Sequence, residues 1–214
     1  MRKHVDNSGT LGAKRQMSAG EILDAAAQAF SERGYAATSI DDVADVLACT
    51  KGRIYHYFRT KGELFMGIHH QGLVWALEAV GPTAERDDLE PKEKLREMVR
   101  RHALHMMEHY TYMGPAQFQI EMNLAGEGRN QDAAMATILT MRRRFEDYYV
   151  QVVKDGMASG AFRETDVNLA TKAMLGSINW MHAWYRPGGP REATTHRERI
   201  AAVLADYAVG GLSA

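Results

Sequence analysis

Apolar residues recur at three- and four-residue spacings along most of the chain, and no segment alternates strictly between apolar and polar positions. Helix-breaking residues interrupt this pattern at Gly34, Gly81-Pro82, Gly114-Pro115, Ser159-Gly160 and Pro187. The pattern predicts an all-α fold of about nine helices. We expect them near residues 17–33, 39–47, 50–58, 61–80, 91–112, 115–124, 131–158, 166–186 and 194–209.

The second and third predicted helices are short and are joined by a tight turn. Ser39 can cap the second helix, with the acid Asp42 three residues later as in a capping box. Val43, Val46 and Leu47 have the spacing of a buried helix face. The second helix is therefore expected to pack inward along most of its length.

The third helix follows the turn Ala48-Cys49, with Thr50 in the N-cap position. Ile54 and Phe58 are four residues apart and can both anchor the helix in a core. The other faces then carry hydrogen-bonding side chains, namely Lys51, Arg53, Tyr55 and His56. A short helix that exposes this many donors is suited to contact another molecule.

A helix-turn-helix places such a helix in the major groove of DNA. Gly52 would allow a close backbone approach, and Lys61 would bring a cation to the start of the fourth helix for a phosphate. The alternative is a plain helical hairpin with a solvated polar face. The predicted DNA contacts are Ser39, Thr50, Lys51, Gly52, Arg53, Tyr55, His56, Tyr57 and Lys61.

Residues 20–66 resemble the DNA-binding domain of the TetR family of transcriptional regulators. The matching residues are Ile22-Leu23, Ala25-Ala26, Phe30, Arg33-Gly34-Tyr35, Thr38-Ser39, Val43-Ala44, Lys51-Gly52, Tyr55-His56-Tyr57-Phe58 and Lys61-Gly62-Glu63-Leu64. Ala48 departs from the family, which usually has glycine in the turn, so some turn strain is expected there. Arg2, Lys3, Lys14 and Arg15 make residues 1–15 a flexible basic arm, which could reach the DNA backbone or minor groove or be a plain flexible terminus. We expect a DNA-binding domain at 16–62 and a ligand-binding and dimerisation domain at 63–214.

Composition and charge agree with this interpretation. The net charge is −1, yet residues 1–61 carry 9 Lys/Arg against 7 Asp/Glu, so the charge is unevenly distributed. No run of 18 apolar residues occurs and no apolar segment follows the basic start, so neither a membrane span nor a secretory signal is expected. The single cysteine, Cys49, cannot form an internal disulfide, which fits a cytoplasmic protein. We expect it to be a small buried apolar residue rather than a redox switch.

The last two long helices are candidates for dimerisation. The ninth has an apolar stripe, and the eighth has small or flexible side chains; these are Ile200, Val203, Leu204, Tyr207, Ala170, Ala173, Ser177 and Met181. An ordinary intramolecular core is the alternative, and part of each stripe must serve it. The resemblance implies that these helices pair with a second copy as a four-helix bundle. A two-fold dimer would place two recognition helices about 34–36 Å apart, in successive major grooves.

The C-terminal domain is expected to hold a small hydrophobic effector. Candidate lining residues are His102, Met106, Tyr110, Phe118, Met122, Trp180 and Trp184, and simple core packing is the alternative for each. Residues 176–189 resemble a segment of TetR-type regulators of lipid, steroid or acyl-group catabolism, which often respond to acyl-CoA thioesters. Arg142, Arg143 and Arg144 could bind the phosphates of such a ligand, or form a solvated face with Glu146 and Asp147.

An enzyme or metal protein is the other class to weigh. His102, His105 and His109 are spaced so that one helix face could bind a metal, with Glu108 or Glu121 nearby. Partly exposed histidines on an amphipathic helix are the simpler interpretation. The sequence contains no HExxH motif, no glycine-rich phosphate loop and no cysteine pair, so no enzyme activity, cofactor or metal is expected.

A structural adaptor is a further alternative, but it would not explain the exposed donors at 50–57. The sequence thus predicts a dimeric, ligand-responsive regulator, a repressor of a palindromic operator. The helix from Lys61 to about Val80 would link its two domains mechanically.

Overall fold

The computed structural model describes residues 17–113, 129–188 and 194–213, and every regular element in these ranges is a helix. This confirms the predicted all-α fold. The helices are α1 (Ala19–Arg33), α2 (Ile40–Val46), α3 (Lys51–Tyr57), α4 (Lys61–Ala84), α5 (Pro91–Glu108), α7 (Arg129–Ala158), α8 (Val167–Asn179), α9 (Met181–Trp184) and α10 (Thr194–Leu212). The predicted arm at 1–15, the predicted helix near 115–124 and the candidates Phe118, Glu121 and Met122 lie outside the described residues.

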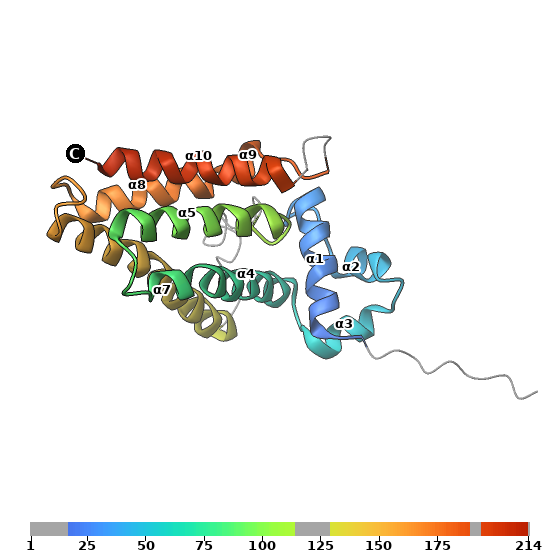
Figure 1. Ribbon diagram of the computed structural model, residues 1–214. Coiled ribbons are helices and arrows are strands. Elements are labelled where there is room, and N and C mark those ends of the chain that lie inside the picture. The colour runs from blue at the N-terminus through green and yellow to red at the C-terminus, as the bar shows by residue number, and fades with distance from the viewer. Residues whose placement is uncertain (1–16, 114–128, 189–193, 214) are drawn as a thin grey trace, which may run out of the picture.

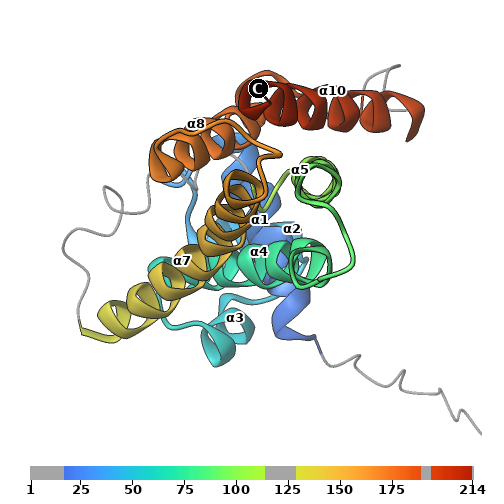
Figure 2. The ribbon, with the colours of Figure 1, turned by 60° about the vertical axis from the view of Figure 1, so that its left-hand side comes forward.

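Helices α1–α3 form a small unit at one end of the molecule, and the longer helices make up the larger remainder (Figure 1). α4 starts in the small unit and continues into the larger part, where it packs against α5 and α7. α10 packs along α5, and α7 crosses α4 (Figure 2). The long link predicted between the two parts is therefore a single continuous helix.

Aromatic packing joins the small unit to α4. Ser18 caps α1 in a capping box, and α1 stops at Gly34, whose φ of 81° suits a residue without a Cβ. The chain reversal at Gly34 brings Tyr35 back against Phe30, with ring centres 5.4 Å apart. The Tyr35 ring also lies 4.6 Å from that of Phe65, on the second turn of α4. These contacts make α1 and the start of α4 one packed body.

Two helix ends differ from the sequence prediction. α4 runs through Ala84 rather than ending at Pro82, because a proline removes only one helical hydrogen bond and the residues after it complete the last turn. α5 ends at Glu108 rather than near 112, because His109 leaves the helical region with φ −104° and ψ 36°. The residues after His109 then form a tight turn.

Within the described ranges, every helix is too short or too polar to span a lipid bilayer.

Candidate functional site

The start of α2 is built as predicted. The Ser39 Oγ accepts a hydrogen bond from the Asp42 N–H at 3.1 Å, and the Asp42 carboxylate accepts one from the Ser39 N–H at 2.7 Å. The Ser39 hydroxyl also donates to this carboxylate at 2.5 Å. This bond, followed by the one from the Ser39 N–H and by Arg33 at 2.9 Å, lowers the pKa of Asp42. The hydroxyl of Ser39 is thus already engaged in the helix cap. On α2, Val43 is buried but Val46 is 51% exposed, so the predicted inward packing of Val46 is wrong.

The turn between α2 and α3 contains the strain that the sequence suggested. Ala48 has a φ of 48°, in the left-handed region that disfavours a residue with a Cβ. The turn is held by the N–H of Ala48, which donates to the Asp45 carbonyl at 3.1 Å, and by that of Cys49, which donates to Ala44 at 3.0 Å. Cys49 is half-buried against the core.

α3 rests on one fully buried side chain, Ile54. Phe58 is only half-buried and follows the helix as its C-cap. Thr50 has the extended backbone of an N-cap, but its side chain makes no capping bond. The exposed residues of α3 are Lys51, Gly52, Arg53, Tyr55, His56 and Tyr57. The structure therefore brings most of the predicted DNA contacts together on one outer surface.

Two predicted contacts also hold the domain together. The Tyr57 hydroxyl donates to the Met17 carbonyl at 2.6 Å, and the Lys61 Nζ donates to the Tyr35 carbonyl at 2.9 Å. Lys61 also lies over the Tyr35 ring, 4.3 Å from its centre. Both side chains therefore have a structural role that the sequence pattern did not indicate. Lys51 makes only a loose pair with Asp41 at 3.6 Å, with both side chains well exposed.

In the C-terminal domain, His102 is part of the packed interior. Its Nδ1 lies 3.2 Å from the Tyr149 hydroxyl, and its ring is edge-on to Phe145 at 4.9 Å. Burial, and secondarily the nearby His105, lower the pKa of His102 to about 3. Met106 is buried beside these residues in the same core. His102 is therefore a neutral core histidine.

The predicted histidine face does not form a metal centre. Burial, followed by the nearby His109, lowers the pKa of His105 to about 4, and its ring lies 4.8 Å from that of His109. His102 is turned toward Tyr149 instead. Residues 17–113, 129–188 and 194–213 contain no group of three or more His, Cys, Asp or Glu placed to hold a metal ion.

The α8–α9 segment places the two candidate tryptophans at the surface. α8 ends at Asn179, and the chain restarts as the short helix α9 instead of continuing to 186 as predicted. The break is stabilised by His182, whose Nδ1 lies 2.8 Å from the Asn179 carbonyl. Trp180 and Trp184 are 60% and 50% exposed. The structure therefore does not group them with His102 in the interior.

Tyr110 and Arg186 bind the end of α9. The Arg186 Nη1 donates to the His182 carbonyl at 3.0 Å and to the Tyr185 carbonyl at 2.8 Å. It also donates to the Tyr110 hydroxyl at 3.2 Å, which in turn donates to the His182 carbonyl at 3.3 Å. Arg186 is thus a cation at a helix C-terminus, and Tyr110 connects this end to the turn that follows α5.

The three consecutive arginines of α7 are all exposed. Arg144 lies 3.8 Å from Glu85 and 3.2 Å from the Tyr148 hydroxyl. The Arg143 Nε donates to the carbonyl of Leu139 one turn earlier, at 3.3 Å. Arg142 is exposed on the same helix. The pairing partner of Arg144 is therefore Glu85 of the neighbouring region, and not the Glu146 or Asp147 of its own helix.

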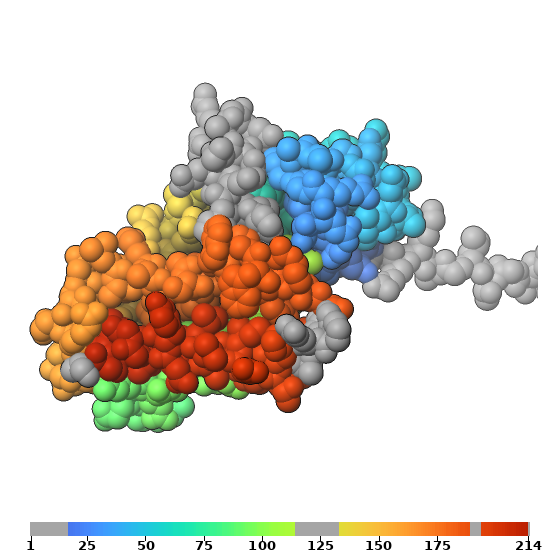
Figure 3. All heavy atoms as spheres, turned by 90° about the horizontal axis from the view of Figure 1, so that it is seen from above, coloured from blue at the N-terminus to red at the C-terminus, as the bar shows by residue number. Residues whose placement is uncertain are grey.

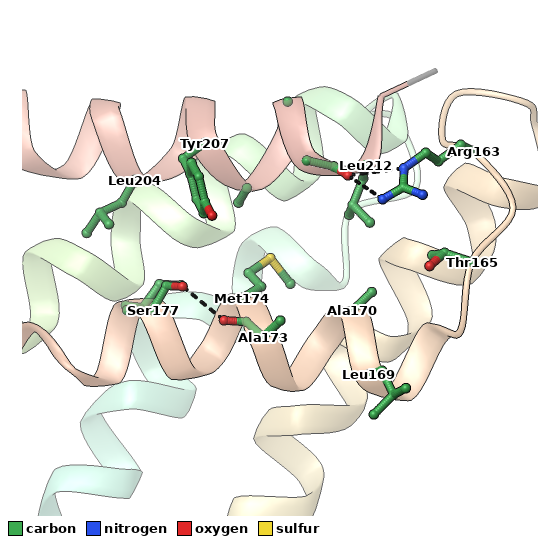
Figure 4. Close-up of a pocket in the computed structure, with 14 residues that line it drawn as sticks. Arg163, Thr165, Leu169, Ala170, Ala173, Met174, Ser177, Leu204, Tyr207 and Leu212 are labelled. Atoms are coloured by element: carbon green, nitrogen blue, oxygen red, sulfur yellow. Dashed lines mark hydrogen bonds between the residues drawn. The ribbon is translucent and has the colours of Figure 1, made fainter.

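α8 and α10 lie side by side on one face of the molecule (Figure 3). Leu169, Val203 and Tyr207 on this face are 65%, 61% and 70% exposed. Between the helices runs a groove of about 570 Å³ with mainly apolar and small side chains (Figure 4). Its lining includes Ala170, Ala173, Ser177, Leu204 and Tyr207. Four of the eight predicted dimerisation residues are therefore exposed, namely Ala173, Ser177, Val203 and Tyr207. Ala170, Ile200 and Leu204 are half-buried against the core, and Met181 is buried in it.

Comparison with known proteins gives two family matches. Residues 22–68 match the bacterial regulatory proteins of the tetR family. Residues 88–212 match the tetracyclin repressor-like C-terminal domain. Together the two matches span the small unit and most of the larger helical part.

Individual proteins are similar to this chain over about nine tenths of its length. The chain is 28% identical over 200 residues to the HTH-type transcriptional repressor KstR2 of Mycobacterium tuberculosis, covering 91% of this chain and 92% of that protein. The structure of the TetR family transcriptional regulator PfmR from Thermus thermophilus has a TM-score of 0.75 at 32% identity, covering 90% and 99% of the two chains. AibR in complex with isovaleryl coenzyme A and operator DNA has a TM-score of 0.70 at 24% identity, covering 90% and 96%.

Proposed function

Because the chain belongs to the TetR family of bacterial transcriptional regulators, we propose that it is a dimeric repressor that leaves a palindromic operator when a small hydrophobic effector binds. The observation that carries DNA binding is the outer surface of α3. There Lys51, Tyr55 and His56 are exposed around the single anchor Ile54. Exposed donors on a short helix can replace water with base edges and phosphates in the major groove. A protein that binds operator DNA in a bacterium would be located in the cytoplasm.

The face of α8 and α10 supports a homodimer. A large exposed apolar surface is unfavourable in water, and a second copy would cover it. Residues Leu169, Val203 and Tyr207 would be buried in that contact. Two recognition helices in one dimer can contact half-sites about one helical turn of DNA apart, so the operator would be an inverted repeat.

The effector is proposed to be an acyl-CoA thioester. The support is the resemblance of residues 176–189 to regulators of acyl-group catabolism, and the similar fold of AibR, whose structure contains isovaleryl coenzyme A. His102, Met106 and Tyr110 would lie near the acyl group, and Phe118 and Met122 remain predictions for its lining. Trp180 and Trp184 are exposed, and an effector or a second subunit would cover them.

The phosphates of the effector would bind at a basic rim formed by Arg142 and Arg143. Both side chains are exposed on α7, and guanidinium groups bind phosphate oxygens in a bidentate manner. Alanine at both positions should raise the concentration of isovaleryl-CoA needed for release of DNA, while operator affinity stays unchanged. Arg101→Ala, an exposed arginine of α5, is the control and should leave both quantities at the wild-type value.

The experiment that tests the proposal has two steps. Selection from random-sequence DNA should yield one inverted repeat bound by the wild-type chain. Calorimetry with isovaleryl-CoA, longer acyl-CoAs, free CoA and free acids should then show binding of thioesters, and these should release the selected DNA. Failure to select any sequence would contradict DNA binding. Binding of free acids alone would contradict the thioester proposal.

A further inference from the structure

A hydrogen bond joins the end of α5 directly to α1. Tyr112 lies in the turn after α5, is 7% exposed, and donates from its hydroxyl to the Asp24 Oδ1 at 2.6 Å. Asp24 is an exposed residue of α1, 88 positions earlier in the sequence. Figure 1 shows the end of α5 beside α1. The large domain therefore contacts the small unit here without passing through α4.

The ring of Tyr112 is held in place by packing against α4. Its ring is edge-on to Trp75 of α4, with centres 4.8 Å apart, and Trp75 stacks on His109 at 4.3 Å and 24°. Its backbone N–H donates to the His109 carbonyl at 3.0 Å. Burial, followed by the hydrogen bond to Asp24, raises the pKa of Tyr112 well above its usual value. The hydroxyl therefore keeps its proton and remains a donor.

The turn that carries Tyr112 sits on α4 at Gly72. A Cβ on Gly72 would lie 3.0 Å from the Met113 Sδ and 3.9 Å from the Tyr112 Cβ, so this glycine permits the close approach. The buried ring of His105 lies near the backbone of Gly72. The end of α5 is therefore seated on α4, and a displacement of α5 would move the Tyr112 hydroxyl relative to Asp24.

We propose that Tyr112 is a positioning residue for operator binding, and that its bond to Asp24 sets the orientation of α1–α3 relative to the larger domain. The inference rests on the proposed function. Tyr112 and Asp24 lie outside residues 39–61, which carry the predicted DNA contacts, so they act through α1 and not by touching DNA. An effector that shifts α5 would change operator affinity through this bond.

The test uses the full chain and the operator selected by the wild type. Tyr112→Phe keeps the ring packing on Trp75 and removes only the donor, and operator affinity should fall roughly tenfold. The slope of affinity against salt should stay at the wild-type value, because no phosphate contact is lost. A thermal unfolding temperature close to wild type would show that the domain itself is intact.

Two variants of Asp24 distinguish the effect of the hydrogen bond on operator affinity from the effect of the negative charge. Asp24→Asn removes the charge but keeps an acceptor oxygen, so it should retain most of the affinity. Asp24→Ala removes both and should match Tyr112→Phe. The double variant with Ala at 24 and Phe at 112 should be no weaker than either single one, because both remove the same bond.

Three results would overturn the inference. One is wild-type operator affinity in Tyr112→Phe, and another is fully additive losses in the double variant. The third is equal loss in Asp24→Asn and Asp24→Ala, which would assign the effect to charge. These differ from failure of the proposed function itself, in which the wild-type chain would select no DNA sequence at all.

Discussion

Two exposed surfaces of this chain differ in chemistry. The outer face of α3 is polar, with Lys51 and His56 beside Tyr55, whereas the face of α8 and α10 is apolar, with Val203 and Tyr207 exposed by 61% and 70%. A polar surface is stable in water and can exchange that water for phosphates and bases. Apolar surface is unfavourable in water by about 25 cal/mol per Å² and predicts a protein partner.

The two sides of α10 also differ in the residues that they carry. Its inner face toward α5 consists largely of small residues, with Ala201 and Ala205 at 0% and 1% exposure. Val209 and Leu212 near its end are also buried, whereas Val203 and Tyr207 are exposed. A helix of a lone globular chain normally places its large apolar residues inside. The exposed pair Val203 and Tyr207 is the part of this helix that the proposed second copy would cover.

The largest expected effect is the loss of the dimer. Val203→Glu would place an unpaired carboxylate in the proposed subunit interface, which costs several kcal/mol. Because Val203 is exposed in the single chain, the fold should remain intact. Sedimentation should show a monomer at micromolar concentration, and operator affinity should fall at least 100-fold.

Ala136→Glu is the matched control, since it adds the same charge at an exposed position of α7. It should remain dimeric and bind the operator as the wild type does. A dimer that persists in Val203→Glu would show that the apolar face of α8 and α10 is not the subunit contact.

A smaller effect is expected on the polar surface. Tyr55→Ala and Lys51→Ala should each weaken operator binding by roughly 10- to 100-fold, while the dimer and the unfolding temperature stay unchanged. The pair of Lys51 with Asp41 is exposed and contributes little to stability. Lys51→Ala should also reduce the log–log salt slope by about one, as for one lost phosphate contact. Unchanged affinity in both variants would contradict the helix-turn-helix assignment.

The two surfaces also differ in how far the sequence predicts them. The cap of Ser39 and Asp42, the anchor Ile54 and the strained turn at Ala48 follow from residues within one or two turns. The contact of Tyr57 with Met17 joins residues 40 positions apart, so no local pattern indicates it.

In the larger domain, the exposure of Trp180 likewise could not be predicted from the local sequence pattern. It depends on where α8 breaks, and the apolar spacing of residues 166–186 continues through that break. Apolar periodicity predicts which side of a helix is buried. It does not tell whether another helix of the same chain or a second molecule covers that side.

The stability of the folded chain should depend on pH, because two histidines are buried in the core of the larger domain. His102 and His105 have pKa values of about 3 and about 4, against an ordinary value of 6.5. Below about pH 6.5 the unfolded chain takes up protons that the folded chain does not, so stability falls with decreasing pH. The two histidines together should remove roughly 4 kcal/mol between pH 7.5 and pH 5.

Urea unfolding at the two pH values measures this loss. His105→Gln should show about half of it, whereas His70→Gln, at an exposed position of α4, should behave as the wild type. Dimer and operator binding should be lost together with the fold at acid pH. If the stability of His105→Gln fell as steeply with pH as that of the wild type, His105 would not be a source of the pH dependence.

The smallest expected effect concerns the turn that supports α3. Ala48→Gly removes the strain of a φ of 48° but adds freedom to the unfolded chain, so the net gain should be about 0.5 kcal/mol. The unfolding temperature should rise by roughly 1–2 °C with no change in operator affinity. A lower unfolding temperature would show that the strain relieved is smaller than the freedom that glycine adds to the unfolded chain.

In the proposed function the polar surface of α3 binds DNA while the apolar surface of α8 and α10 binds a second copy of the chain. Sedimentation of the wild-type chain, alone and with its selected operator, measures both at once. We expect a dimer at micromolar concentration and two chains on one inverted repeat, with half-site centres about one helical turn apart. A monomer that binds tightly to a single, unrepeated site would contradict it.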